Sequence, residues 1–527
     1  MKTEKIAPCV LVAAACALNA CGVSNLPQVP AGQAPHEYRN VVVHDPSILK
    51  AGDGYYYVNG SDMCGARTAD LIDWEQISKD IRYDEPSWFS DTRSELKDVM
   101  AWGHTRTFWA SCLIRLKSGP YAGKYMFDYC VCQGGCPQAA IGYALADRPE
   151  GPYKDMGVLL YSFGSARTGD IYDEDTVAKL RAGERGDVDT FVDIRTPAGD
   201  VVRYNSNFMP NAIDPCTFYD ADDQLWMVYG SFSGGIFMLK LNDDGTIHRE
   251  PGDDYYGHLV MGNYHSTIEG PFIMYSPETK YYYLFTSFGM LQPSGGYNVR
   301  VFRSRTPDGD YVDAAGNHAI DCKGIPGQTL ARQHPYMEKY GLKMMGNFEF
   351  EPYGGEENPS EAYLSPGHNS ALYDAERGQY FFFHHTRFKG QGDKYQVRVR
   401  EMFMNEDGWP VIAAHRYAGD IKGAKFSAKD LAGTWKYINH GTRITADIVE
   451  SSLIDLHPDG TVTGAVQGTW KLVKKDGRNY ATFNLGGHEF KGVFHYQYDP
   501  DNNVNRLTFT ACGPTNETVW GSKAETK

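Results

Sequence analysis

The hydrophobic positions of this chain follow the alternation of short β-strands, and little of the chain shows helical periodicity. One composite pattern recurs five times. A polar residue precedes a short apolar strand, a turn with Asp or Gly follows, and an aromatic strand and one further strand complete the unit. The copies open at Asp45, Phe108, Asp214, Glu269 and His368. Five such units predict an all-β fold with a five-bladed β-propeller, and a β-sandwich with hairpins repeated by chance is the alternative.

Two long polar segments interrupt the repeat, at about residues 164–207 and 306–366. Insertions of this kind usually decorate the face of a domain where ligands bind. The composition shifts again near residues 419–425. We therefore expect the propeller to occupy residues 38–422 and a smaller domain to occupy residues 423–527. Short alternating strands in that domain predict an antiparallel β-barrel or sandwich.

The N-terminus has the features of an export signal. Two lysines precede the apolar residues 6–18, which are too few to span a bilayer as a helix. The sequence Leu18–Cys21 then resembles the lipobox of bacterial lipoproteins, in which the cysteine is acylated. We expect a signal peptide at 1–20, lipidation of Cys21 and a tether at 21–37, in an outer-membrane lipoprotein that faces the periplasm or the cell surface. An ordinary signal peptide in which Cys21 is incidental is the alternative.

Composition narrows the classes of ligand. A net charge of −15 cannot neutralise many phosphates, so we expect no nucleic-acid partner. The same charge disfavours a polyanionic polymer and is compatible with a neutral one. Aromatic residues make up 13% of the chain, and flat rings stack well on the apolar faces of sugars.

Eight cysteines follow the N-terminal segment, and three of them form the cluster Cys130, Cys132 and Cys136. No histidine cluster lies nearby, so a disulfide or buried thiols are favoured over a zinc site.

Three of the polar residues that open the repeats are carboxylates, namely Asp45, Asp214 and Glu269. The start of each innermost strand of a propeller faces the central axis, so these side chains should converge. Pro46, Pro215 and Pro271 follow them closely and fix the local backbone. Glycoside hydrolysis needs one protonated carboxyl and one ionised carboxylate, held in different electrostatic settings. Any one of the three could be a turn or cap residue, but equivalent positions in three repeats favour catalysis.

Several motifs resemble glycoside hydrolase family 43, in particular its endo-1,5-α-L-arabinanases. The three signature segments correspond to His44–Ser47, Asn211–Pro215 and Ile268–Pro271. Further agreement comes from Phe108–Ala110, Tyr229–Phe237, Gly367–Ser370 and Val397–Phe403. The resemblance covers about residues 38–420, and the smaller domain resembles one attached to some of these arabinanases.

The resemblance implies a role for each carboxylate. Asp45 would be the general base, Glu269 the general acid, and Asp214 would tune the pKa of the acid and orient it. The family inverts configuration, and the implied substrate is α-1,5-linked L-arabinan or its oligosaccharides. Departures from the pattern, such as Gly270 where relatives often have alanine, put the exact substrate in doubt.

The resemblance also implies a calcium ion held with the help of His368, largely through water. By itself, a lone histidine is more often structural, and imidazole is not a typical calcium ligand. Candidate substrate contacts are stacking by Trp109 and Phe232, hydrogen bonds from Asn211 and Ser231, and His44 in the pocket wall. The alternatives are packing between blades for the aromatic residues and closure of a strand end for His44.

Two rival functions share these features. One is an exo-acting α-L-arabinofuranosidase or β-xylosidase of the same family, which would use the same carboxylates. The other is a non-catalytic surface lipoprotein that binds glycans, and the presence of all three carboxylates argues against it. We expect a monomer whose contact with the membrane is made only by the lipid anchor.

Overall fold

A computed structural model describes residues 38–81, 88–132, 138–162, 192–195, 201–207, 209–356, 361–421 and 426–524. The predicted signal peptide, Cys21 and the tether lie outside this part of the chain, as does Cys136. Within the described residues, no helix is both long and apolar enough to cross a membrane.

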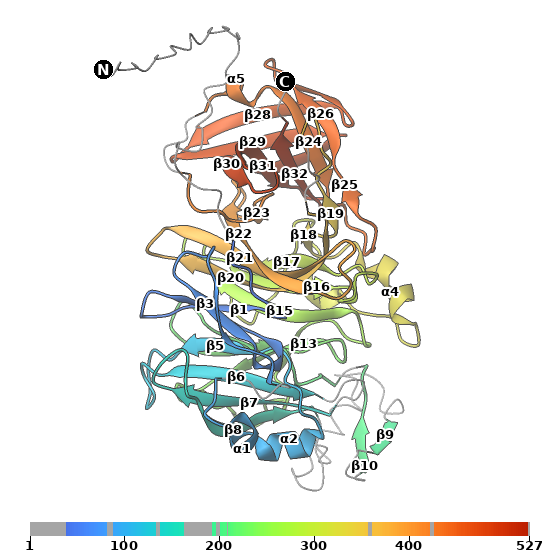
Figure 1. Ribbon diagram of the computed structural model, residues 1–527. Helices are drawn as coiled ribbons and strands as arrows, with labels where there is room; N and C mark the ends of the chain where they lie inside the picture. The colour runs from blue at the N-terminus through green and yellow to red at the C-terminus, as the bar shows by residue number, and fades with distance from the viewer. Residues whose placement is uncertain are drawn as a thin grey trace, which may run out of the picture.

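Five antiparallel sheets form the predicted five-bladed propeller, and a separate closed barrel follows them (Figure 1). The first blade contains β1 (Ser47–Lys50), β2 (Tyr56–Asn59), β3 (Gly65–Thr68) and β4 (Glu75–Ser78). The second contains β5 (Cys112–Arg115), β6 (Tyr125–Cys132), β7 (Ala139–Ala146) and β8 (Lys154–Tyr161). The third contains β11 (Cys216–Tyr219), β12 (Leu225–Tyr229), β13 (Ile236–Lys240) and β14 (His258–Met261).

The fourth blade contains β15 (Ile268–Tyr275), β16 (Tyr282–Phe288), β17 (Asn298–Ser304) and β18 (Leu342–Met345). The fifth contains β20 (Tyr363–Asp374), β21 (Gln379–Phe388), β22 (Tyr395–Met404) and β23 (Pro410–Ile412). Two short strands, β19 (Phe348–Glu349) and β25 (Val449–Glu450), extend the fifth sheet. The innermost strands β1, β5, β11, β15 and β20 contact one another in sequence, and β20 contacts β1, so the ring closes.

Apolar packing between the first and fifth blades seals this closure. Val41, Val43 and Ile48 share one buried cluster with Phe381 and Phe383 of β21. A backbone hydrogen bond from Val397 to the Val41 carbonyl adds to the contact. The first blade of the propeller is therefore packed directly against the last one.

The α-helices in the described part of the chain are short: α1 (Thr92–Glu95), α2 (Lys97–Gly103), α4 (Leu330–Met337) and α5 (Ala428–Leu431). The polar insertion at about 164–207 contains the antiparallel pair of β9 (Val192–Arg195) and β10 (Val201–Tyr204), which the repeat pattern did not predict.

The C-terminal strands close into an antiparallel barrel, which resolves the choice between barrel and sandwich. Its strands are β24 (Gly433–Asn439), β26 (Ser452–Leu456), β27 (Thr461–Gly464), β28 (Gly468–Lys475), β29 (Arg478–Leu485), β30 (His488–Asp499), β31 (Val504–Cys512) and β32 (Thr518–Lys523). Aromatic side chains fill the interior, with Trp435 5.3 Å from Phe509 and Phe483 4.5 Å from Phe509 between ring centroids.

The connection from β24 to β26 leaves the barrel and returns to the propeller. Its strand β25 pairs in parallel with β19 of the fifth sheet. The Lys343 ammonium donates to the carbonyls of His440 and Arg443 in the same connection, at 2.9 and 2.8 Å. The barrel and the propeller are thus joined by main-chain pairing as well as by side-chain packing.

The cysteines of the described residues are all buried: Cys64, Cys112, Cys130, Cys132, Cys216, Cys322 and Cys512. Of the two alternatives for the Cys130 cluster, a buried thiol is correct for Cys130.

Candidate active site

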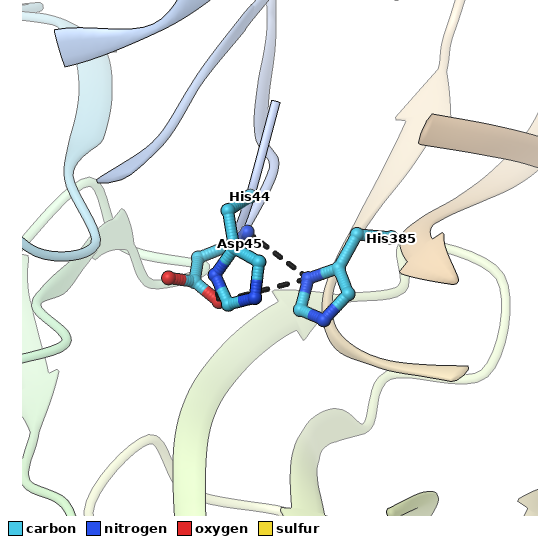
Figure 2. A group of neighbouring side chains, drawn as sticks. All are labelled: His44, Asp45 and His385. Carbon is cyan, nitrogen blue, oxygen red and sulfur yellow. Dashed lines mark hydrogen bonds and ion pairs between the residues drawn. The ribbon is translucent and has the colours of Figure 1, made fainter. Parts of the chain in front are cut away.

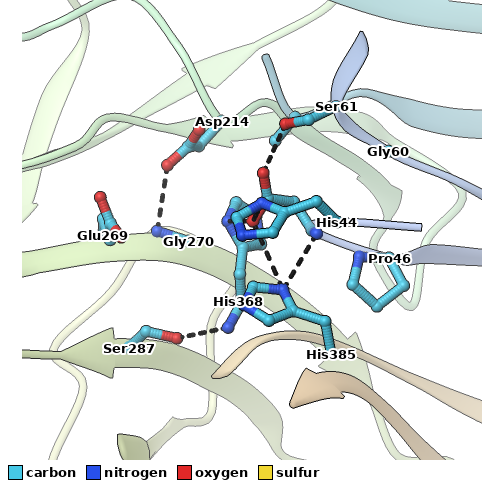
Figure 3. A network of polar contacts seen from close by, with 12 residues as sticks. His44, Pro46, Gly60, Ser61, Asp214, Glu269, Gly270, Ser287, His368 and His385 are labelled. Atoms are coloured by element: carbon cyan, nitrogen blue, oxygen red, sulfur yellow. Dashed lines mark hydrogen bonds and ion pairs between the residues drawn. The ribbon is translucent and has the colours of Figure 1, made fainter. Parts of the chain in front are cut away.

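The polar residues that open four of the predicted repeats meet in one place, as the repeat pattern predicted (Figure 3). Asp45 precedes β1, Asp214 precedes β11, Glu269 lies at the start of β15, and His368 lies in β20. We call these four residues the axial cluster. The three carboxylates are buried, and each interacts electrostatically with His368.

The backbone is unusual at both aspartates. Asp45 and Asp214 have left-handed φ angles of 55° and 56°, and each is followed by proline. Aspartate tolerates this region better than most residues, but such conformations still cost on the order of 1–3 kcal/mol. Their matching geometry in two blades indicates that the same turn aims both carboxylates toward the axis.

Asp45 is surrounded by hydrogen-bond donors. Its carboxylate lies 2.8 Å from His44 Nδ1 and 3.1 Å from His368 Nδ1, and it accepts a hydrogen bond of 2.5 Å from Ser61 Oγ. Burial alone would raise the pKa of Asp45, but the charges and hydrogen bonds of His44 and His368 hold it well below its usual range. Asp45 is therefore ionised at neutral pH.

Glu269 and Asp214 have the opposite electrostatic setting. Burial raises the pKa of Asp214 to about 8, and repulsion from Glu269 and Asp45 adds to it against the attraction of His368. Burial also raises the pKa of Glu269, although hydrogen bonds from Tyr297 (2.7 Å) and Ser231 (3.0 Å) oppose the shift. The pair of Glu269 and Asp214 therefore retains a proton at neutral pH, beside an ionised Asp45.

Gly270 is in close contact with both Asp214 and His368. The amide of Gly270 donates to Asp214 Oδ2 at 3.3 Å, and Gly270 itself has a φ of 59°. A β-carbon at Gly270 would lie 2.9 Å from Cγ of His368, so glycine lets this ring pack directly on the strand. The Ser287 hydroxyl fixes the backbone there by accepting from the His368 amide at 2.8 Å.

Residues 38–171 and 196–410 match the family of glycosyl hydrolases 43, and residues 414–521 match a C-terminal lipocalin-like domain. The chain belongs to glycosyl hydrolases family 43. It is 40% identical to extracellular endo-α-(1→5)-L-arabinanase 2 of Bacillus subtilis, over 92% of this chain and 94% of that protein. It is also 40% identical to extracellular endo-α-(1→5)-L-arabinanase of Thermotoga petrophila, over 93% and 95%.

Family 43 structures agree with the fold. The crystal structure of endo-1,5-α-L-arabinanase from Thermotoga petrophila superposes with a TM-score of 0.79 and 39% identity, covering 93% of this chain and 99% of that one. The resemblance, the all-β class and the propeller with its C-terminal barrel are thus confirmed. The roles predicted for individual residues rest on the geometry above and remain predictions.

Sequence reasoning missed a second group of residues that lie beside the axial cluster. His385, in β21, stacks on His44 with ring centroids 4.0 Å apart and accepts from the Asp45 amide at 3.1 Å (Figure 2). The Arg387 guanidinium lies 3.3 Å from His44 Nε2 and 3.4 Å from His385 Nε2. These contacts hold His44 in its place beside Asp45. The only sequence signal for them was the polar run 384–387 after an aromatic strand.

Of the five predicted substrate contacts, two lie against a carboxylate of the axial cluster, and three are half-buried residues described by their local surroundings. Ser231 and His44 belong to the site, since they contact Glu269 and Asp45. Phe232 is half-buried with a left-handed φ of 53°, and Asn211 is half-buried with a buried side-chain oxygen that has no hydrogen-bond partner among the described residues. Trp109 is also half-buried and packs against the core of the second and third blades, as in the packing alternative.

Two places near the axis offer ligand atoms for a metal ion. His44, Asp45 and His385 have such atoms within 4.8 Å of one another, but the Arg387 cation beside both histidines disfavours a metal ion there. Burial lowers the pKa of His368, but attraction from the three carboxylates raises it overall to about 9. The three carboxylates therefore favour one positive charge among them, either the proton on His368 or a calcium ion that replaces it, since carboxylate oxygens are the donors that calcium prefers. The residues around His368 fit a calcium ion better than those around His385 do.

Proposed function

We propose that this protein is an endo-acting arabinanase that hydrolyses α-1,5-linked L-arabinan with inversion of configuration. One observation carries the proposal: the axial cluster holds an ionised Asp45 and a protonated Glu269–Asp214 pair in one buried site. This is the division of labour that glycoside hydrolysis requires. Two relatives that share 40% of their residues with the chain are named endo-α-(1→5)-L-arabinanases, which supports the choice of substrate.

The reaction follows from these protonation states. Asp45 accepts a proton from a water molecule as the water oxygen attacks the anomeric carbon. The bond from that carbon to the leaving oxygen breaks, and Glu269 gives its proton to that oxygen. Because the Glu269–Asp214 pair shares one proton, the state in which Asp214 is ionised favours the protonated form of Glu269 by like-charge repulsion. Asp45 ends protonated and Glu269 ionised, and exchange with solvent restores both.

The stereochemistry tests this assignment of roles. Asp45 and Glu269 come from different blades, an arrangement that favours the wide separation of about 6.5–9.5 Å that an inverting enzyme needs for its water. Proton NMR of the first products from a linear α-linked arabinan oligomer should show the β-anomer. Appearance of the α-anomer first would require one carboxylate to act as a nucleophile.

Endo action is tested by the size of the products. Linear arabinan should give a broad distribution of oligosaccharides early in the reaction. Release of a single small sugar from the start would favour the exo-acting alternative, and no products from linear or branched arabinan would favour the non-catalytic one.

Calcium is the metal that we propose for the site at His368, where it would supply a fixed positive charge beside the carboxylates. Chelation should lower the melting temperature, and His368→Ala should abolish that response. An anomalous-scattering map of a calcium-soaked crystal with no ion near His368 would contradict this.

Export and lipid anchoring at Cys21 complete the proposal. The names of the two relatives, which call them extracellular, support export, and the motif Leu18–Cys21 is the basis for the anchor. Labelled fatty acid should be incorporated into the wild type and not into Cys21→Ala. Equal labelling of the two would exclude the lipobox.

A further inference from the structure

A cleft of about 430 Å³ lies between the fifth blade and the barrel. Strands β21 and β22 contribute Gln379, Glu401 and Phe403, and strands β29 and β30 contribute Arg478, Asn479 and His495. Figure 1 shows the barrel stacked over this blade. The volume is within the range of ordinary small-ligand sites, about 300–1,000 Å³.

The cleft has an aromatic wall. Glu401 and Phe403 alternate with buried residues along β22 and so share one face of the sheet. The ring of Phe403 lies 4.6 Å from that of His495, between centroids, across the domain boundary. Both side chains are half-buried, so they remain partly accessible from the cleft.

Two residues that line the cleft each have a buried polar atom without a hydrogen-bond partner among the described residues. Gln379 donates from Nε2 to Asp420 at 3.1 Å, but its side-chain oxygen has no hydrogen-bond partner. His495 contacts Thr508 Oγ1 through Nε2 at 3.0 Å, but its Nδ1 has none. Unsatisfied buried polar groups of this kind carry a cost that a ligand or ordered water can remove.

The cleft presents little net charge at neutral pH. Arg478 is paired with Glu278 through both of its terminal nitrogens, one of them at 2.8 Å. Burial raises the pKa of Glu401 to about 8, with a further contribution from Asp420, and burial lowers the pKa of His495 to about 3. A neutral ligand with many hydroxyl groups suits this environment better than an anion or a cation does.

We propose that this interdomain cleft is a second saccharide site, which binds a segment of a neutral polysaccharide chain. The amides of Gln379 and Asn479, the Glu401 carboxyl and the His495 ring offer hydrogen bonds to sugar hydroxyls, and Phe403 offers an apolar ring. The choice of arabinan as that polysaccharide rests on the proposed function.

The cleft is remote from the axial cluster. Gln379 lies at the start of β21, six residues before His385, a separation of about 20 Å at roughly 3.3 Å per residue. The second site therefore increases the affinity for long chains and leaves cleavage of short ones unchanged.

Calorimetric titration with a linear arabino-oligosaccharide tests the proposal, in a Glu269→Gln background that cannot consume the ligand. Two binding sites per chain are expected. Adding Gln379→Ala and Asn479→Ala should remove one of them, or weaken it roughly fivefold or more for each hydrogen bond lost. The matched control is Asn484→Ala, an exposed asparagine on the same strand β29. Equal stoichiometry and affinity in the cleft variant and the control would overturn the proposal.

Hydrolysis by otherwise wild-type enzyme separates this inference from the proposed function. The cleft variant should show a raised KM on polymeric arabinan and an unchanged kcat/KM on a short oligosaccharide. If wild-type enzyme does not hydrolyse arabinan, the proposed function fails, while the titration still decides whether the cleft binds a saccharide. A crystal soaked with the oligosaccharide provides a readout independent of any variant, with density expected against Phe403.

Discussion

The axial cluster and the interior of the barrel are both buried regions enclosed by antiparallel strands, yet they are built in opposite ways. The barrel encloses aromatic side chains such as Trp435, Phe483 and Phe509 in close ring contact. The axial cluster encloses three carboxylates that repel one another, on backbone that is left-handed at two of them. The comparison teaches that one β architecture can use its interior for stability in one domain and for reactivity in the other.

The largest expected effect is on the rate, from substitutions in the axial cluster. Glu269→Gln and Asp45→Asn each remove a general acid or base, so kcat on linear arabinan should fall about a hundredfold to ten-thousandfold. The fold should survive, as judged by circular dichroism. A folded Glu269→Gln enzyme with nearly wild-type turnover would remove Glu269 from the acid role.

A substitution in the interior of the barrel should lower stability and leave the catalytic rate unchanged. Trp435 is fully buried and its indole donates to the Leu431 carbonyl at 2.9 Å. Trp435→Ala should lower the free energy of unfolding by about 3–5 kcal/mol and leave kcat/KM of the folded enzyme unchanged. Chemical denaturation followed by activity assays of the folded fraction measures both. Leu453→Ala, at an exposed position of the barrel, is the control and should change stability little.

Asp214→Asn should separate stability from activity within the axial cluster. The pKa of Asp214 is raised to about 8 in the folded state, against about 4 when unfolded. The native protein therefore holds a proton that the unfolded chain releases, and its stability falls as pH rises from about 4 to about 8. Asparagine does not titrate, so the variant should gain stability relative to wild type over that range while losing activity.

Melting temperatures of both proteins between pH 4 and pH 8 test this sign. The exposed turn variant Asp222→Asn is the control and should show no such trend. A constant difference between Asp214→Asn and wild type across the range would contradict the raised pKa.

The smallest expected effect comes from Tyr297, which supports the acid without reacting. Tyr297→Phe keeps the ring that lies nearly parallel to His385 but removes the 2.7 Å hydrogen bond to Glu269. Because that bond lowers the pKa of Glu269, its loss should move the alkaline limb of the kcat/KM profile upward and lower the maximum roughly tenfold. Tyr311→Phe, which loses a bond to the Pro307 carbonyl, is the control. An alkaline limb that does not move would assign Tyr297 a purely structural role.

The strand repeat predicted the propeller and all four members of the axial cluster, because the position of a residue at the opening of a repeat is a local property of the sequence. His385 and Arg387 were not predicted, because they occupy the interior of β21 and reach the site only after the first and fifth blades close on each other. The hairpin β9–β10 was missed because its segment is mostly polar. The choice between a barrel and a sandwich needed the long-range pairing of β24 with β32, which strand patterns do not specify.

The chain between β24 and β26 limits how far this enzyme can be shortened at its C-terminus. Since β25 forms the edge of the fifth sheet opposite β23, beside β19, deleting the last hundred residues would take a strand out of this sheet. The bared edge of β19 would then offer unpaired amides and carbonyls to another molecule, which favours aggregation. The C-terminal part is therefore not a detachable module, and domain exchange among relatives should succeed only when the donor supplies the matching connection.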